Sequence, residues 1–506
     1  MTVSGKVGRF KNKYQITNPK YISENASLIK DKHKKYSLTD GISEKIYNKI
    51  INQILSNIPK LEEWHGGNIL KKFNNISWNN SIIELHKPEN IGKYQSNFYQ
   101  RLAYDEILAS FMVHSEIRKK IKKIKKQKKV FNHIYQSSLF SKLDFDLTND
   151  QKISLNEINQ DLKSNQKMFR LLQGDVGSGK TIVALTAAYN VIKSGFQVAV
   201  MAPTEILARQ HFQLAKNIFD KKIRIEILSG KSEYKEKKKI LKKLSNNEVD
   251  IIFGTHAIFQ KKVIFNNLGL IIIDEQHKFG VNQRKKLSDK GGDNCDVLLM
   301  TATPIPRTLT MTIYGDMDLS IIREKPKSRK EVKTYSKLEN KISDVLRFIK
   351  KEINNRNQIF WVCPLIEESK KLDHSSAVEK YNYLKKKFPN QVALLHGKTS
   401  IEEKEIILNK FLNQKIKILV STTIIEVGID FPNANVIVIE NANKFGLSQL
   451  HQLRGRVGRG QKQSTCILMF KSSLTENAKK RLNILKNSTD GLSLIHISEP
   501  TRRYSI

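Results

Sequence analysis

The carboxyl-terminal two thirds of the chain alternates short apolar runs with helical stretches, and this pattern constrains the fold more than any other feature. Apolar runs without interspersed polar residues are typical of strands that are buried on both faces, as in a parallel sheet between two layers of helices. The charged, proline-containing segment REKPKSRKEV at 323–332 has the character of a linker and divides the runs into two groups. The sequence therefore predicts an α/β chain with two parallel sheets, at about 146–328 and 329–490. The runs are FQVAVMAP, VDIIFGT, LGLIIIDE, DVLLMTA, QIFWVCP, QVALLHG, KILVSTT and ANVIVIE.

The first 145 residues follow a different pattern. Residues 3–17 alternate apolar and polar side chains around FKNK, which predicts a half-buried β-hairpin that packs on other structure. Residues 22–145 have helical periodicity and predict connecting helices. Within them, the segment 117–131 places isoleucines at helical spacing among nine lysines and arginines. Two interpretations of this basic segment stay open: a solvated amphipathic helix, or a helix that contacts nucleic-acid phosphates.

Composition excludes several classes of protein. A hydrophobic fraction of 39% is enough for ordinary cores, so global disorder is excluded. The formal net charge of +39 attracts polyanions and favours a nucleic-acid partner over a merely solvated basic surface. Cys295, Cys363 and Cys466 form no CxxC pair, which argues against a disulfide framework or a thiolate zinc site and favours a reducing setting. No apolar run approaches the roughly 18 residues of a membrane span, and no secretory core follows the first methionine.

The most specific motif is GDVGSGKT, which follows the apolar FRLLQ and opens the helical run TIVALTAAYNVI. It matches GxxxxGK[ST] in the strand–loop–helix context that a phosphate-binding loop requires. Gly174, Gly177 and Gly179 would let backbone N–H groups close around phosphate oxygens at a helix N-terminus. We expect Lys180 to reach the β and γ phosphates and the Thr181 hydroxyl to hold Mg²⁺. The motif thus predicts ATP and Mg²⁺ as cofactors.

An acidic element ends the apolar run LGLIII. We expect Asp274 to bind Mg²⁺, directly or through water, and Glu275 to polarise the attacking water. Without such a function, two carboxylates at a buried strand end would be an unpaired charge cost. Thr301 and Thr303 close the next apolar run, and only their neighbours make them credible site residues.

The second sheet contributes the glycine-punctuated segment QLRGRVGR, in which Gln452, Gly455, Arg456, Gly458 and Arg459 form the pattern QxxGRxGR. Arginines on such a segment can neutralise charge that develops on a transferred phosphoryl group, an effect worth ~10³ or more in rate. The alternative is a basic surface loop. Because a phosphate loop belongs to the other sheet, we predict two domains that close on ATP.

These motifs together resemble superfamily 2 helicases, and their longer strings are similar to the RecG family of bacterial ATP-dependent DNA helicases. The resemblance extends from about residue 3 to Gly491. Transcription-repair coupling factors are the nearest other family, because their motor shares the GDVGxGKT and TATPIPRTL wording, but their usual acidic motif reads DEEQ instead of DEQH. The absence of a zinc-binding cysteine cluster counts against the primosomal restart helicase. The strings that carry the resemblance are GDVGSGKT, MAPTEILARQH, GTHAIFQ, IIIDEQHKFGVNQR, MTATPIPRTL, VCPLIEES, LLHGKTS, STTIIEVGIDFPNA and FGLSQLHQLRGRVGRG.

The resemblance implies a domain organisation. Two tandem RecA-like motor domains, an ATP-binding domain at 146–328 and a helicase carboxyl-terminal domain at 329–490, follow a helical linker region at 22–145. Residues 1–21 resemble only the final strands of the family's wedge, which has the oligonucleotide-binding (OB) fold. The family continues beyond Gly491, whereas 491–506 ends in LSLIHISEPTRRYSI, which matches nothing in the family. We therefore expect a chain that is fragmentary at both ends, with an anomalous tail.

Further roles follow from the resemblance alone. Gln151 resembles a glutamine that reads adenine, Gln452 belongs with the nucleotide-binding residues, and His277, Thr301, Thr303 and Glu426 resemble residues that couple hydrolysis to DNA contacts. Hydroxyls and backbone N–H groups at strand ends can bind phosphates without reading bases, as a motor moving over any sequence requires. Each threonine could instead only cap a helix. The residues that resemble DNA-gripping loops are Pro203, Thr204, Glu205, Gly254, Thr255, His256, Thr422 and Thr423.

The function implied by the resemblance is an ATP-driven DNA translocase that remodels branched DNA, by replication-fork reversal and Holliday-junction branch migration, in recombination and repair. It implies a bacterial cytoplasmic, nucleoid-associated protein with a single-strand-binding protein as a partner and no membrane contact. Two alternatives stay open. One is a transcription-linked translocase, and the other is a DNA-binding fragment that does not unwind DNA productively and whose binding is salt-sensitive. For this chain we expect ATP hydrolysis with weak strand separation.

Overall fold

The chain divides into two compact units, Met1–His114 and Ser115–Ile506. The site residues His277, Thr303, Thr423, Glu426 and Arg459 lie outside the residues that the structure describes, as does the tail beyond residue 487. The computed structural model describes residues 2–5, 7–10, 13–17, 19, 21–24, 36, 41–87, 90, 95–229, 234–275, 292–302, 315, 317–326, 330–364, 370–396, 399–422, 431–458, 462–471 and 474–487.

The first unit begins with two antiparallel strand pairs, β1 (Thr2–Ser4) with β4 (Tyr21–Ser23) and β2 (Val7–Phe10) with β3 (Lys13–Ile16). The β2–β3 pair is the predicted hairpin, but all four residues of β3 are exposed. The prediction of a half-buried hairpin is therefore wrong for this strand. Alternating side chains give a strand two different faces, but a face is buried only where another layer covers it.

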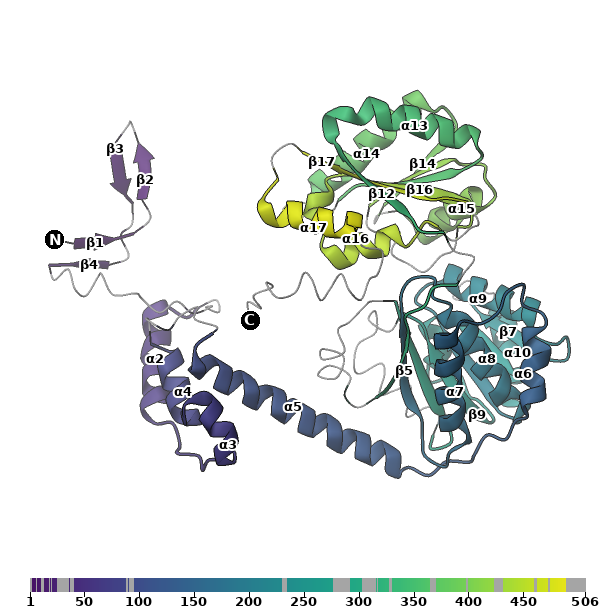
Figure 1. The fold of residues 1–506 in the computed structure, drawn as a ribbon, viewed down its shortest axis with the longest axis horizontal. Coiled ribbons are helices and arrows are strands. Elements are labelled where there is room, and N and C mark those ends of the chain that lie inside the picture. Colours follow the sequence, from purple (N-terminus) through teal and green to yellow (C-terminus); the bar gives the residue numbers. More distant parts are fainter. Residues whose placement is uncertain are drawn as a thin grey trace. The chain divides into compact units, whose positions relative to one another are not determined.

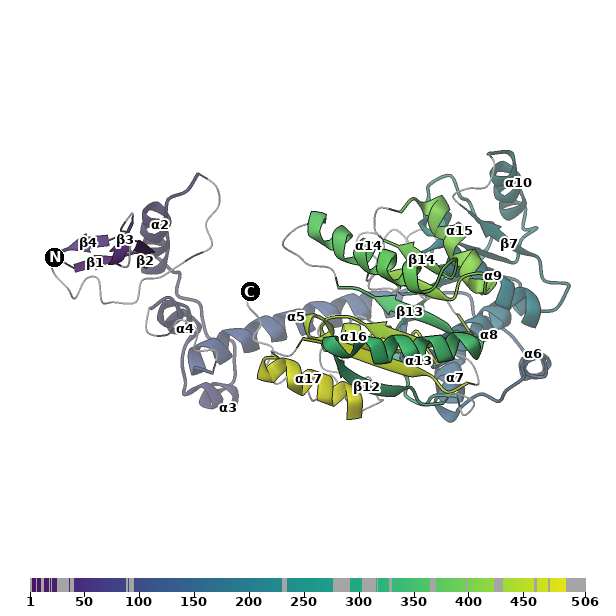
Figure 2. The same ribbon diagram turned by 90° about the horizontal axis from the view of Figure 1, so that it is seen from above.

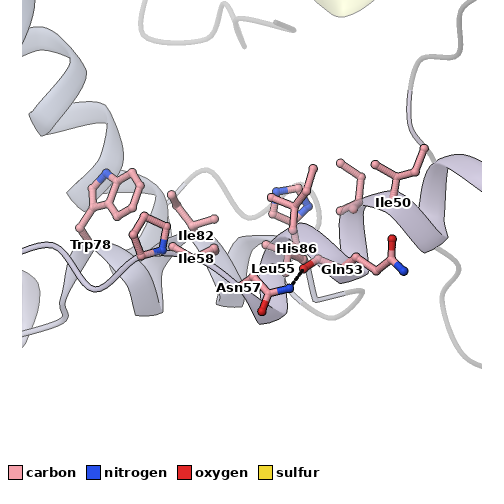
Figure 3. Close-up of a pocket in the computed structure, with 11 residues that line it drawn as sticks. Ile50, Gln53, Leu55, Asn57, Ile58, Trp78, Ile82 and His86 are labelled. Atoms are coloured by element: carbon pink, nitrogen blue, oxygen red, sulfur yellow. Dashed lines mark hydrogen bonds between the residues drawn. The ribbon is translucent and has the colours of Figure 1, made fainter.

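Short helices make up the rest of the first unit. Hydroxyl groups start two of them, since Ser43 Oγ accepts a hydrogen bond from Ile46 N and Ser77 Oγ accepts one from Asn80 N. An open apolar groove runs between two of the helices and is lined by residues that include Ile50, Ile54, Ile58, Trp78, Ile82 and His86 (Figure 3). The helices are α2 (Glu44–Ser56), α3 (Gly67–Leu70), η1 (Lys71–Phe73), α4 (Trp78–Leu85) and α5 (Asn97–Lys123).

The basic segment 117–131 is helical only in part, because α5 ends at Lys123. Lys126 and Lys129 lie beyond the helix, fully buried, and both ammonium groups bind the carboxylate of Asp296, at 2.6 and 2.8 Å. The prediction of one basic helix is therefore wrong for its second half. A buried carboxylate in another part of the chain takes two lysines that the periodicity assigns to a solvated face.

Lobe 1 of the second unit is a seven-stranded sheet in which every neighbouring pair is parallel, in the order β11-β5-β10-β9-β6-β8-β7. Alternate strand residues enter two separate cores: Leu270 and Ile272 face one core, and Ile271 and Ile273 face the other. Helices cover both faces (Figure 1). The elements are α6 (His133–Phe140), α7 (Asn149–Lys163), β5 (Phe169–Gly174), α8 (Lys180–Lys193), β6 (Gln197–Met201), α9 (Glu205–Ile218), β7 (Ile225–Leu228), α10 (Tyr234–Ser245), β8 (Ile251–Gly254), η3 (His256–Phe259), β9 (Leu268–Ile273), β10 (Asp296–Thr301) and β11 (Asp318–Ile322).

Lobe 2 is a six-stranded parallel sheet in the order β12-β17-β16-β13-β15-β14. Its α13 and α14 pack on one face and α15, α16 and α17 on the other (Figures 1 and 2). The prediction of two parallel sheets in an α/β chain is thus confirmed. The elements are β12 (Lys333–Leu338), η5 (Glu339–Lys341), α13 (Ile342–Asn354), β13 (Gln358–Val362), α14 (Lys370–Lys387), β14 (Val392–Leu395), α15 (Ile401–Leu412), β15 (Ile418–Ser421), β16 (Ala434–Ile439), η7 (Ala442–Lys444), α16 (Leu447–Arg454), β17 (Thr465–Phe470) and α17 (Glu476–Asn487). Among all helices of the described ranges, none combines the length and apolarity that crossing a membrane would require.

Candidate nucleotide-binding site

The carboxyl edge of the lobe 1 sheet gathers most of the predicted site residues. Because the strands are parallel, the ends of β5, β6, β8, β9 and β10 lie along one edge, where ligands bind in open α/β sheets. The register confirms this arrangement, since Met201 pairs with both Ile273 and Gly254 and Thr301 pairs with Gln173. The phosphate loop, the acidic pair and the loops after β6 and β8 therefore share one edge.

The phosphate loop connects β5 to α8 and requires its glycines. Gly177 and Gly179 have φ angles of 76° and 83°, in the left-handed region that favours glycine. A Cβ atom on Gly174 would lie 2.5 Å from Ser178 Oγ, so a side chain does not fit there either. Lys180 is the first residue of α8, and its Nζ donates to the carbonyl oxygens of Gly174 at 2.8 Å and Asp175 at 2.9 Å. The loop thus forms a closed cradle with a cation inside it, at a helix N-terminus.

Gln151 joins this cradle to the start of α7. Its Nε2 donates to the carbonyl oxygen of Ser178 at 2.7 Å, and its Oε1 accepts from the backbone N–H of Thr148 at 2.9 Å. The second bond completes a capping box with the Thr148 hydroxyl. The structure therefore brings Gln151 to the phosphate loop as a support, and its contact with adenine stays a prediction.

The acidic pair follows β9. Asp274 Oδ2 lies 2.9 Å from His211 Nε2 of α9, and Asp274 Oδ1 accepts from the backbone N–H of Glu275 at 2.9 Å. Burial opposes ionisation of Asp274, but the hydrogen bond and charge of His211 and the charge of Lys180 outweigh it and lower the pKa of Asp274. Glu275 is buried and has a φ angle of 51°, which is uncommon for a residue with a Cβ and occurs at functional sites. An ionised, oriented carboxylate of this kind can take part in holding Mg²⁺.

The predicted DNA-gripping residues of lobe 1 occupy loops after β6 and β8. Thr204 Oγ1 accepts from the backbone N–H of Leu207 at 3.4 Å and so caps α9, as the alternative interpretation predicted. Thr255 begins η3 without a side-chain cap, and His256 is exposed. Pro203, Glu205 and Gly254 lie on the same two loops, and Thr301 and Thr422 are buried at strand ends. Whether any of them contacts DNA stays a prediction.

Lobe 2 reaches the phosphate loop through the segment after α16. A Cβ on Gly455 would lie 3.0 Å from Val176 Cβ, so the two lobes are in direct contact at this point. Arg456, the next residue, is buried, and Gly458 has a φ angle of 79° and packs against Val332 of the segment between the lobes. Gln452 is half-buried on α16. The predicted arginine segment is therefore next to the phosphate loop, and the contact of Arg456 with a phosphate stays a prediction.

Sequence reasoning missed two buried histidines that support the site, His211 on α9 and His451 on α16. A signal was present for His211. Together with Ala208, Ala215 and Ile218 it forms a buried stripe at helical spacing, so an ionisable side chain occupies a position that the periodicity reserves for the core. Such a residue requires a partner, which here is Asp274.

Comparison with known proteins identifies the family. A DEAD/DEAH box helicase model matches residues 148–312, and a helicase conserved C-terminal domain model matches residues 340–461. The chain is 42% identical over 465 residues to the ATP-dependent DNA helicase RecG of Bacillus subtilis, across 91% of this chain and 68% of that protein. The chain belongs to the RecG family of ATP-dependent DNA helicases. This assignment confirms the predicted resemblance and separates the chain from the transcription-repair coupling family.

Other relatives agree with the assignment. RecG of Thermotoga maritima is 41% identical over 509 residues, across 99% of this chain and 64% of that protein. A solved structure of RecG bound to a three-way DNA junction has a TM-score of 0.76 and 38% identity, and the match covers 99% of this chain and 67% of that one. Yeast Dbp5 bound to RNA and ADP BeF3, at 17% identity and a TM-score of 0.54, shares the fold of the two lobes, which are RecA-like as predicted. The chain spans about two thirds of the length of its RecG relatives.

Proposed function

We propose that the chain is the motor of an ATP-dependent DNA helicase that remodels branched DNA, by fork reversal and Holliday-junction branch migration, in recombination and repair. The contact of Gly455 with Val176 carries this proposal, because it sets the arginine segment of lobe 2 against the phosphate loop of lobe 1. A motor of this class requires such an arrangement, since hydrolysis can then alter the relation between the lobes. The junction-bound relative supports branched DNA as the substrate.

The residues of the loop suit a nucleotide with Mg²⁺. The glycine cradle excludes side chains, Ser178 Oγ is buried with no hydrogen-bond partner among the described residues, and the pKa of Asp274 is lowered, so that this carboxylate is charged. The described residues contain no group of three or more His, Cys, Asp or Glu side chains that could hold a metal ion alone. Mg²⁺ would therefore depend on phosphate oxygens as well as on Asp274 and Thr181, which is the way it is commonly bound in ATPases.

Each side chain then has a defined role. Mg²⁺-ATP supplies the phosphoanhydride bond whose cleavage drives the motor. Lys180 exchanges its loop carbonyl partners for phosphate oxygens, and Thr181 and Asp274 orient the metal ion. Glu275 accepts a proton from the attacking water. Arg456 and Arg459 neutralise the charge that develops on the transferred group.

Other side chains would connect the nucleotide to DNA. We propose that the loops containing Thr204, Thr255 and Thr422 hold the phosphate backbone of DNA, and that His277 and Glu426 couple this contact to hydrolysis. We further propose a bacterial nucleoid setting and a single-strand-binding protein as a partner, which a pull-down from a lysate with added DNA would test. The two motor domains have proposed limits of 146–328 and 329–490, with the linker at 323–332 as the expected site of limited proteolysis.

ATP turnover measured with and without a three-way junction tests the proposal. We expect Mg²⁺-dependent turnover that the junction stimulates and that Lys180→Ala lowers at least a hundredfold, on the order of a lost phosphate contact in the transition state. Lys193→Ala is the matched control, because Lys193 is the last residue of the same helix and pairs with Asp220 at the surface. Turnover that is absent in the wild type, or equal in Lys180→Ala, would reject the enzyme.

Salt-sensitive DNA binding that ignores nucleotide, in the absence of turnover, would instead identify a DNA-binding fragment. We also expect this chain to separate the strands of a fork only weakly. Strong fork unwinding would contradict that expectation.

A further inference from the structure

The carboxylate of Asp175, the second residue of the phosphate loop motif, is bound from outside lobe 1. Its Oδ1 lies 2.8 Å from Nε2 of His451, on α16 of lobe 2, and its Oδ2 lies 3.1 Å from Nζ of Lys325, in the linker between the lobes. Burial would raise the pKa of Asp175, but the hydrogen bond and charge of His451 and the charge of Lys325 outweigh it and hold the pKa below its usual range. This carboxylate is thus ionised and shared among three parts of the chain.

Arg454 orients the ring of His451. One guanidinium nitrogen, Nη2, lies 2.9 Å from His451 Nδ1, and the other, Nη1, donates to the carbonyl oxygen of Leu485 in α17 at 2.7 Å. A guanidinium group only donates, so Nδ1 accepts and the ring proton is on Nε2, from which it is donated to Asp175. A continuous series of hydrogen bonds therefore connects the phosphate loop to two helices of lobe 2.

The linker is held at the same place. The backbone N–H groups of Arg323 and Glu324 donate to Asp150 Oδ2, at 2.8 and 3.0 Å. Asp150 belongs to the first turn of α7, next to Gln151, which itself binds the phosphate loop. The residues around Asp175 also enclose a small interlobe cavity, which is lined by Val176, Lys325, Lys330, Glu331, Val332, His451, Arg454 and Gly455.

We infer that Asp175, His451 and Lys325 form a latch that docks lobe 2 on the phosphate loop before any nucleotide binds. The latch sets the segment that contains Arg456 beside the loop, so that its three residues are positioning residues for hydrolysis. None of the three is assigned to the nucleotide, the metal ion or DNA by the family motifs. The docking itself does not depend on the proposed function, but its consequence for turnover does.

The distance between the lobes, measured without ATP or DNA, tests the docking. Cysteines introduced at Lys261 of lobe 1 and Lys351 of lobe 2, both exposed, would carry spin labels for a pulsed dipolar measurement. The three native cysteines are buried and would not compete for the label. Into this background we would place His451→Leu, which can neither donate to Asp175 nor accept from Arg454, and Asp175→Asn, which removes the charge.

Two further variants serve as controls. His451→Gln can donate through its amide nitrogen and accept through its amide oxygen, so it should restore the docked distance. Asp220→Asn removes a carboxylate of lobe 1 that binds Lys142, Lys193 and Tyr189 of its own lobe, and it should leave the distance unchanged.

We expect a narrow distance distribution in the wild type and a broad one, extending to longer distances, in His451→Leu and Asp175→Asn. Loss of a hydrogen bond to a charged group corresponds to a change of about tenfold to a hundredfold in the docking equilibrium. Distributions equal to the wild type in both variants would overturn the latch. The result does not require turnover, so a chain without ATPase activity would reject the proposed function while this measurement still decides the docking.

Turnover kinetics test the positioning role. In His451→Leu we expect kcat to fall about tenfold while KM for ATP changes less than about threefold, and we expect His451→Gln to recover kcat. A variant that only destabilised lobe 2 would lower its thermal midpoint and its active fraction, and the glutamine would not separate the two effects in this way. An opened lobe distance with unchanged kcat would overturn the positioning role.

Discussion

His211 Nε2 lies 2.9 Å from Asp274 Oδ2, and this bond connects α9 to the carboxyl end of β9. The second oxygen of Asp274 accepts from the backbone N–H of Glu275, so both carboxylate oxygens have a fixed direction. Residues that orient a metal-binding side chain matter nearly as much as the side chain itself. His211 therefore belongs to the candidate site although it need not touch the nucleotide.

Replacing His211 by leucine should weaken the response to Mg²⁺. The carboxylate of Asp274 would lose a partner that orients it and favours its ionised form. Loss of a residue of this kind costs about 10-fold to 100-fold in metal affinity or activity. A titration of ATP turnover with Mg²⁺ would show a half-maximal concentration raised by that factor.

Gln213→Ala on the same helix is the matched control, because Gln213 is exposed and binds only Asn217 among the partners that the structure describes. Its Mg²⁺ titration should overlay the wild type. A wild-type titration for His211→Leu would show that the histidine merely fills space.

The buried charges at Asp296 predict a large effect on stability. Lys126, Lys129 and Asp296 have no exposed side-chain area, and Asp296 also accepts from the backbone N–H of Met168 at 2.7 Å. Asp296→Ala would leave two buried ammonium groups without their counter-ion, which costs about 3–5 kcal/mol. The free energy of unfolding of lobe 1, from a urea titration, would measure this loss.

Glu116→Ala is the control for a charge that is exposed. Glu116 pairs with Lys119 on the surface of α5, and both side chains are about two thirds exposed. The urea midpoint should not move, because solvent screens such a pair. Equal effects of the two substitutions would contradict the account of Asp296.

Sequence reasoning predicts the two sheets because their strands are buried on both faces, and a run such as LGLIII at β9 has no other simple explanation. It predicts the phosphate loop for a similar reason, since Gly177 and Gly179 adopt backbone angles that few other residues tolerate. Local constraints of this kind are written in adjacent residues.

Contacts between distant residues are not written in this way. The end of α5 at Lys123 depends on Asp296, which is 170 positions away from Lys126 and offers no local signal. The contact of His451 with Asp175 spans 276 positions and joins two lobes. A periodicity that marks Lys126 as solvated and His451 as part of a helix cannot identify a partner on another element.

Asp220 predicts a pH-dependent contribution to stability. Hydrogen bonds from Lys142 and Tyr189, and then from Lys193, hold the pKa of Asp220 below its ordinary value. Because the folded pKa is lower than the unfolded value of about 3.9, the stabilisation is present above that pH and is lost as the pH falls toward the folded pKa. Asp220→Asn should therefore be less stable than the wild type at pH 7, and the difference should shrink below about pH 4.

Thermal unfolding of both proteins from pH 7 to pH 2.5 would measure this difference. Subtracting the variant from the wild type removes the contribution of every other titrating group that the two share. A difference that stayed constant over the whole range would show that the charge of Asp220 contributes nothing.

Two glycines with nearly the same backbone separate the strain of the phosphate loop from its fit. Gly179 and Gly195 have φ angles of 83° and 84°, so alanine at either position should cost roughly 1–2 kcal/mol of stability. A Cβ on Gly179 would also lie 2.3 Å from Gln151 Nε2, whereas a Cβ on Gly195 would meet no atom within 4 Å. Gly179→Ala must therefore displace Gln151 from the Ser178 carbonyl oxygen and deform the cradle, but Gly195→Ala leaves the loop intact. We expect the two variants to have similar thermal midpoints, with ATP binding, measured by calorimetry, weakened at least tenfold only in Gly179→Ala. Equal ATP affinities would mean that the cradle does not depend on the contact between Gln151 and the loop.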